Sequence, residues 1–112
     1  MSTLVSMSTL DRNTIIQQIK KVKEEVVPES KLILFGSQAR GDAGPDSDWD
    51  LLILVDKDVL SPSDFDRLAY PFVRVGWDFG AYFSMKLYTL SEWMKREGTL
   101  FFKNVEAEGI EL

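Results

Sequence analysis

The chain contains neither cysteine nor histidine. Because it lacks cysteine, it has no disulfide framework and no zinc–thiolate site. Because it lacks histidine, it is without the commonest general base and metal ligand of proteins. Any chemistry must therefore depend on carboxylates, hydroxyls, lysine and arginine.

Long apolar runs and an excess of positive charge are also missing. No apolar run approaches the ~20 residues needed to span a bilayer. The first residues, MSTLVSMSTL, lack the basic and apolar regions of a secretory signal. The formal net charge of -5 argues against a general nucleic-acid-binding surface. We therefore expect a cytoplasmic protein whose partners include neither membrane nor nucleic acid.

The length of 112 residues suits one small domain, and the apolar share of 45% is enough for a core. We expect residues 1–10 to form a flexible N-terminal extension. We expect residues 11–112 to form the domain itself.

Apolar spacing and turn residues predict helices and strands in the order α-β-β-α-β-α. The expected elements are a helix over residues 11–27, strands over 31–35 and 49–55, a helix beginning near Ser61, a strand over 82–88, and short helices after Thr89 and from Leu100. Pro71 should kink or shorten the second helix, and Thr89 and Glu92 have the spacing of a capping box. This order predicts an α/β (α+β) fold with a small mixed sheet of three to four strands flanked by helices.

The aromatic residues are predicted to lie mainly in the core. We expect Trp49, Trp77, Tyr82 and Phe83 to pack there rather than to stack on a nucleobase. Trp93 is predicted to be either a half-buried anchor or part of a surface for a partner.

Two carboxylates, Asp48 and Asp50, stand at the start of the apolar stretch 49–55. On a strand, side chains two residues apart point to the same face, roughly 6 to 7 Å from each other. Two such anions repel, and burial increases the cost. A divalent cation such as Mg²⁺, which prefers carboxylate oxygens, phosphate and water, would relieve that repulsion. The alternative is that both residues only make the loop soluble or cap a turn.

The stretch between the first two predicted strands contains a Gly-Ser pair and an arginine. Gly36 allows a sharp turn and a close approach of a ligand to the backbone. Ser37 offers a hydroxyl beside backbone N–H groups, which together form an anion site. Arg40 either contacts a phosphate or braces the loop by pairing with an acid such as Asp48. A phosphate cradle linked to metal carboxylates is typical of phosphoryl or nucleotidyl transfer, whereas a Gly-Ser pair alone would indicate only a turn.

Two linked stretches resemble the signature of the DNA polymerase β-like nucleotidyltransferase superfamily. They are Gly36-Ser37-Gln38-Ala39-Arg40-Gly41 and Ser47-Asp48-Trp49-Asp50-Leu51-Leu52-Ile53. The small size is similar to that of the minimal nucleotidyltransferases, the MNT proteins of bacteria and archaea. The resemblance covers about residues 11–112.

The resemblance implies an enzyme that transfers a nucleoside monophosphate, AMP from ATP above all, to an acceptor hydroxyl. By this resemblance Gly36 and Ser37 bind the nucleotide triphosphate, and Arg40 is a candidate nucleotide-binding residue beside them. Asp48 and Asp50 are implied to be the catalytic ligands of two Mg²⁺ ions. The acceptor attacks the α-phosphate and pyrophosphate leaves.

The sequence departs from the superfamily's pattern at its third carboxylate. That carboxylate lies on the next strand, on the face of the first two, but the stretch 82–88 contains no acid. Ser84 or Lys86 occupies the expected position, and Asp78 is the nearest acid before the strand. A lysine there would neutralise the aspartate pair without metal, and a partner is another source of the missing acid.

Larger members of the superfamily carry a second domain for the acceptor. We therefore expect the acceptor to come on a partner or across a homo-oligomer interface. The resemblance to minimal nucleotidyltransferases implies, as a partner, a helical HEPN-type ribonuclease toxin. Two functions follow: a nucleotidyltransferase, or an antitoxin or regulator of weak or absent activity that binds and masks such a partner.

Overall fold

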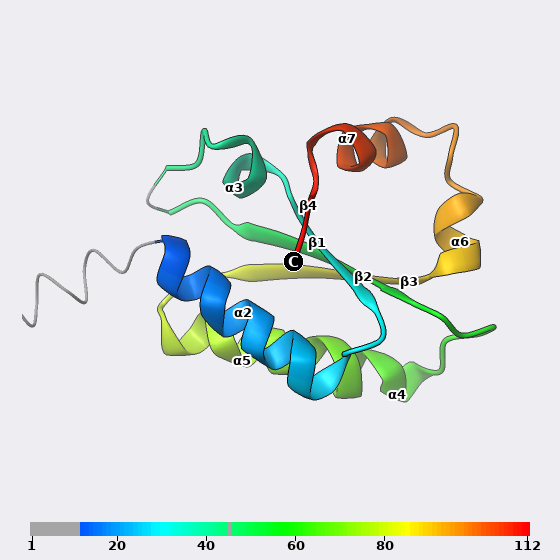
Figure 1. Cartoon of the computed structure of the whole chain (residues 1–112), viewed down its shortest axis with the longest axis horizontal. Coiled ribbons are helices and arrows are strands. Elements are labelled where there is room, and N and C mark those ends of the chain that lie inside the picture. Colours follow the sequence, from blue (N-terminus) through cyan, green and yellow to red (C-terminus); the bar gives the residue numbers. More distant parts are fainter. Residues whose placement is uncertain (1–11, 45) are drawn as a thin grey trace, which may run out of the picture.

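In the computed structural model of the chain, residues 12–44 and 46–112 are described, and they form a four-stranded sheet covered by helices (Figure 1). The N-terminal extension predicted over residues 1–10 lies outside the described residues. The elements in chain order are α2 (Arg12–Val26), β1 (Lys31–Phe35), α3 (Ser37–Arg40), β2 (Trp49–Val55), α4 (Pro62–Asp64), the π-helical η1 (Phe65–Ala69), α5 (Tyr70–Asp78), β3 (Phe83–Thr89), α6 (Leu90–Met94), α7 (Leu100–Glu108) and β4 (Ile110–Glu111). No helix among the described residues is long and apolar enough to cross a membrane.

The sheet is mixed, as predicted, with the strand order β3-β2-β1-β4. β1 pairs antiparallel with β2 and with β4, whereas β2 pairs parallel with β3. A parallel pair needs a crossover, and here α4, η1 and α5 provide it. β2 is a central strand, and all its residues except Asp50 are buried.

The two faces of the sheet are covered by different helices. On the first face, Leu34, Leu51 and Ile53 share a core with residues of α2 and α5. On the second face, Leu52 and Leu54 pack with residues of α6 and α7. Figure 1 shows α2 and α5 on one side of the sheet and α6 and α7 on the other. Because side chains alternate along a strand, Asp50 lies on the second face with Leu52 and Leu54.

The predicted capping box opens α6. The Glu92 amide donates to Thr89 Oγ1 at 3.0 Å, and the Thr89 amide donates to Glu92 Oε1 at 2.9 Å. This start directs the next residue, Trp93, into the core on the second face of the sheet. There Trp93 is 2% exposed, and its ring centre lies 4.8 Å from that of Phe102. Trp93 is therefore a core anchor rather than part of a surface for a partner.

Pro71 changes the form of the crossover helix without ending it. A proline within a helix removes one backbone N–H and crowds the preceding turn. The five residues Phe65–Ala69, which directly precede Tyr70 and Pro71, are π-helical. The wider turn accommodates the proline, so helical structure runs on from Pro62 to Asp78.

The prediction for the aromatic residues is half right. Trp49 and Phe83 are buried and lie 5.9 Å apart between ring centres. The prediction is wrong for Trp77 and Tyr82, which are 61% and 63% exposed. Trp77 lies on the outer side of α5, where it packs edge-on against Tyr70 at 5.7 Å, and Tyr82 precedes β3 at the edge of the sheet.

Candidate functional site

The Gly-Ser turn and the second aspartate meet at one end of the sheet. The register pairs Phe35, the last residue of β1, with Asp50, the second residue of β2. Gly36 follows with φ 75 and ψ -159, a conformation essentially restricted to glycine. A Cβ at Gly36 would lie 2.2 Å from Asp50 Oδ2. The backbone conformation therefore favours glycine at this position, and the absence of a side chain lets the Asp50 carboxylate approach closely.

The short helix α3 is held from outside by residues that sequence reasoning missed. Gln38 is buried, and its carbonyl accepts hydrogen bonds from Arg12 Nη2 at 2.9 Å and Nε at 3.3 Å. Its side-chain Nε2 donates to the Ser47 carbonyl at 3.5 Å. The N–H groups of Ser37 and Gln38, in the first turn, have no acceptor within the helix by position. Arg12 and Ser47 thus fix the turn that presents those groups.

Asp48 and Asp50 form the acidic side of the site. Asp48 is exposed and stands just before β2, while Asp50 is half-buried on the second face. Burial raises the pKa of the Asp50 carboxyl, and the charge of Asp48 raises it further. The charges of Lys86 and Arg40 act on this pKa in the opposite direction. The repulsion expected between the two carboxylates is therefore present, with two cations near enough to offset part of it.

The parallel pairing of β2 and β3 shows which residues stand beside the aspartates. Ser84 lies opposite Asp50, and Lys86 lies opposite Leu52. Ser84 is half-buried and Lys86 is exposed, both on the second face. Asp78, by contrast, is exposed at the end of α5, and α5 packs on the first face. The structure thus brings Ser84 and Lys86 to the aspartate pair but does not bring Asp78 there.

The donor set near the aspartates fits one hard cation. Two carboxylates on one face are typical ligands for Mg²⁺, which completes its shell with phosphate and water. Among residues 12–44 and 46–112 there is no group of three or more His, Cys, Asp or Glu side chains that could hold a metal ion. In this part of the chain, Asp48 and Asp50 therefore have no third His, Cys, Asp or Glu ligand beside them.

Arg40 braces the loop, though not through the predicted acid. Its Nε pairs with Asp42 at 3.2 Å, and its Nη1 pairs with Glu108 of α7 at 3.3 Å. The hydrogen bond to Asp42, and to a smaller extent the one to Glu108, raises the pKa of the Arg40 guanidinium. The side chain is still partly exposed, so it can exchange these partners for a phosphate.

A pocket of about 230 Å³ lies beside Gly36 and Arg40. Its far wall belongs to α7 and includes Phe101, Asn104 and Glu108. Phe101 also packs edge-on against Phe35 at 5.5 Å. Sequence reasoning did not connect α7 with the site, because only the fold places these residues next to the Gly-Ser turn.

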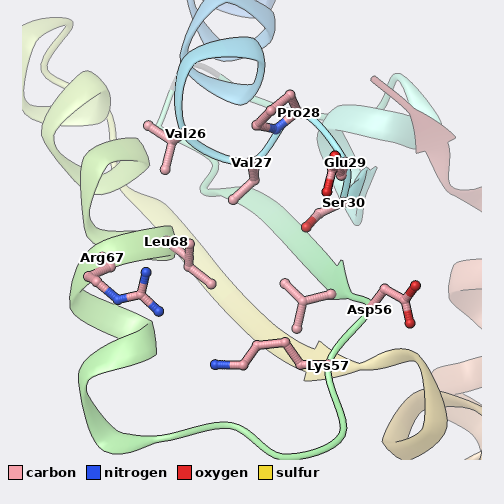
Figure 2. A pocket seen from close by; sticks show the side chains of 10 residues that line it. Val26, Val27, Pro28, Glu29, Ser30, Asp56, Lys57, Arg67 and Leu68 are labelled. Carbon is pink, nitrogen blue, oxygen red and sulfur yellow. The ribbon is translucent and has the colours of Figure 1, made fainter.

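A second pocket, of about 260 Å³, lies at the other end of β2 (Figure 2). Its lining includes Val55, about 16 Å along the strand from Asp50. Figure 2 shows the Lys57 and Arg67 side chains extending toward each other across it. Both pair with Asp64, whose side chain is buried and whose Oδ2 also accepts from the Ser61 amide at 2.7 Å. Those donors hold the pKa of Asp64 well below its usual range, and we interpret this cluster as structural.

Comparison with known proteins identifies a family and several solved structures of similar fold. A family model described as nucleotidyltransferase domain matches residues 15–99. Among solved structures, a candidate nucleotidyltransferase from Sulfolobus solfataricus is 18% identical with a TM-score of 0.60, covering 94% of this chain and 85% of that chain. No curated protein matches the chain.

Two further similar structures come from toxin–antitoxin systems. One, solved with AMP-PNP, is 18% identical with a TM-score of 0.59, covering 85% of this chain and 69% of that chain. The other is a mutant of the pair MntA-HpeT, 20% identical with a TM-score of 0.59, covering 87% of this chain and 70% of that chain. At these identities the likeness is one of fold.

Proposed function

Because the chain belongs to the nucleotidyltransferase domain family, we propose that it is a Mg²⁺-dependent enzyme that transfers AMP from ATP to a hydroxyl of a protein or small-molecule acceptor. The observation that supports this most strongly is the contact between the Gly36 turn and the Asp50 carboxylate. It joins a candidate phosphate cradle to a pair of candidate metal ligands at one end of β2.

In this proposal the Gly-Ser turn binds the triphosphate. Gly36 has no side chain, so a phosphate can approach its backbone closely. Ser37 adds a hydroxyl, and the first turn of α3 adds the backbone N–H groups of Ser37 and Gln38. Arg40, the last residue of α3, breaks its ion pair with Asp42 or Glu108 and pairs with a phosphate oxygen instead.

The aspartate pair holds the cation in this proposal. Asp48 is exposed and accessible to an incoming nucleotide, while Asp50 is fixed by β2 and by its contact with Gly36. A divalent ion held by these two aspartates would supply Lewis-acid stabilisation of the negative charge on the phosphate oxygens. The acceptor oxygen bonds to the α-phosphorus as the bond to pyrophosphate breaks, and the acceptor's proton is released to solvent.

Transfer from radiolabelled ATP tests this function. We expect Asp48→Asn to abolish labelling of an acceptor and to leave the circular dichroism spectrum unchanged. Asp78→Asn is the matched control, because Asp78 is an exposed acid on the opposite face, and it should retain transfer. Full transfer by the folded Asp48→Asn variant would contradict the assignment.

A second function is favoured by the residues beside the aspartates. With Ser84 and Lys86 in place of an acid, the chain is suited to act as an antitoxin or regulator that masks a HEPN-type partner with little or no transfer. The likeness to two toxin–antitoxin structures supports this alternative. It predicts that the Asp48→Asn protein still binds and silences its partner, whereas silencing that depends on AMP transfer to that partner would be lost.

A further inference from the structure

We propose that this site takes a single divalent cation, on Asp48 and Asp50, and that the Lys86 ammonium supplies the positive charge that a second ion would otherwise bring. The proposal rests on the proposed function, because it concerns the same nucleotide site. It deepens that function by assigning a role to the residues of β3.

The register of the sheet places no acid beside Asp50. A third carboxylate would have to stand on β3, on the second face, next to this aspartate. Ser84 lies directly opposite Asp50, and Lys86, two residues on, shares its face. Tyr82, two residues earlier, precedes the strand, and its carbonyl accepts from the Trp49 amide at 2.9 Å. None of these three neighbours is an acid, so β3 offers no anionic ligand.

The charge of the residues on β3 also disfavours a second ion. A serine hydroxyl is neutral, and an ammonium carries no lone pair to offer a metal ion. Lys86 also repels a divalent cation, because like charges at close range near a protein surface interact several times more strongly than in bulk water. A second ion would therefore bind beside Asp50 only against the charge of Lys86.

Lys86 is available for this role. Its side chain is exposed, and it belongs to none of the ion pairs formed among the described residues. Its charge nevertheless acts on the Asp50 carboxylate. A lysine that is close to the aspartates and committed to no other acid can contact a phosphate oxygen of the nucleotide.

The number of bound Mn²⁺ ions tests the proposal without any need for turnover. Mn²⁺ is titrated into the chain in the presence of the non-hydrolysable analogue α,β-methylene-ATP, and the bound ion is counted by electron paramagnetic resonance. We expect the wild-type chain to hold one Mn²⁺ per bound nucleotide and Ser84→Asp to hold two. Ser91→Asp, at an exposed serine of α6, is the matched control and should hold one.

Each result decides a separate question. Two Mn²⁺ ions in the wild type would overturn this inference and leave the proposed function intact. No Mn²⁺ and no nucleotide bound to the wild type would overturn the proposed function itself. If Ser84→Asp does not fold, Lys86→Glu serves as a second variant that adds an acidic ligand on β3. A folded gain-of-ligand variant that still holds one ion would contradict the role of β3.

Discussion

Gly36 and Asp50 are in such close contact that a Cβ on the glycine would lie 2.2 Å from Oδ2 of the aspartate. The contact follows from the antiparallel register, which ends β1 opposite the second residue of β2. It ties the conformation of the turn to the position of the carboxylate, so a change in either residue should affect the other.

Replacement of Gly36 by alanine should destabilise the fold at the site. The substitution forces a Cβ into the Asp50 carboxylate and strains a backbone at φ 75, so we expect a loss of roughly 2–6 kcal/mol, the sum of strain and overpacking. Urea unfolding measures it. Gly41→Ala is the matched control, because Gly41 has φ 88 but no heavy atom within 4 Å of the added Cβ. If the two variants lost equal stability, the contact with Asp50 would have no energetic weight.

The Asp50 carboxyl should make the fold less stable as the pH rises. Its folded-state pKa is raised, by burial first and by Asp48 second, so the native state binds more protons than the unfolded chain. The free energy of unfolding therefore falls as the pH rises from the ordinary pKa of 3.8 through the raised pKa. Asp50→Asn removes this penalty, and we expect it to be more stable than the wild type at pH 7.

Urea midpoints measured from pH 3 to pH 7 check this difference. The gain from Asp50→Asn should shrink toward zero at the acidic end, where the wild-type carboxyl is protonated. Asp58→Asn, at an exposed position in the loop after β2, should change little at any pH. An Asp50→Asn variant less stable than the wild type at pH 7 would show that the carboxylate stabilises the fold, contrary to this prediction.

The buried Asp64 should stabilise the fold without affecting the site. Its carboxylate accepts from the Ser61 amide and pairs with Lys57 and Arg67, so Asp64→Ala should cost roughly 1–3 kcal/mol at pH 7. Because its folded-state pKa is lowered, the contribution is present above the ordinary pKa of 3.8 and is lost as the pH falls through the folded-state pKa. Chemical denaturation at several pH values measures both effects.

Nucleotide binding separates the structural role of Asp64 from the transfer site. Since the Asp64 cluster lies at the other end of β2, the folded Asp64→Ala protein should bind ATP with unchanged affinity. Asp66→Ala, at an exposed position two residues away, controls for the substitution and should leave stability nearly unchanged. A large loss of ATP affinity in Asp64→Ala would link the two ends of the sheet.

Variants of Arg40 and its partner should distinguish a phosphate contact from a structural brace. If Arg40 binds the triphosphate, Arg40→Ala should weaken ATP binding by roughly ten-fold, the value of one charge-assisted hydrogen bond. Glu108→Gln weakens the pairing of the guanidinium with α7, so it should leave ATP binding unchanged or tighten it. Equal losses in both variants, measured by calorimetry, would show that Arg40 acts only as a brace.

The local part of the fold was predictable from the sequence. The strands Lys31–Phe35 and Trp49–Val55 have the predicted bounds, because turn residues flank both. The third strand is shifted by one residue to Phe83–Thr89, since Thr89 both ends the strand and caps α6. The alternation that places Asp50 on one face of the sheet was likewise a local property.

The rest of the site depends on contacts between distant segments. No local sequence pattern indicates that Arg12 bonds to Gln38, 26 residues away. None indicates that α7 forms a pocket wall beside Gly36. Whether Trp77 lies in the core or on the surface was equally hidden, because it depends on which side of α5 meets the sheet. The position opposite Asp50 was narrowed to Ser84 or Lys86 by sequence, and only the register of β3 assigns Ser84 to it.

Calorimetric titration of ATP with Mg²⁺ tests the central claim most directly, in the wild type and in the Asp48→Asn/Asp50→Asn double variant. We predict Mg²⁺-dependent binding to the wild type and its loss in the double variant, with both proteins folded. Absence of binding to the wild type, or equal binding to both proteins, would contradict a nucleotide site built on these two aspartates.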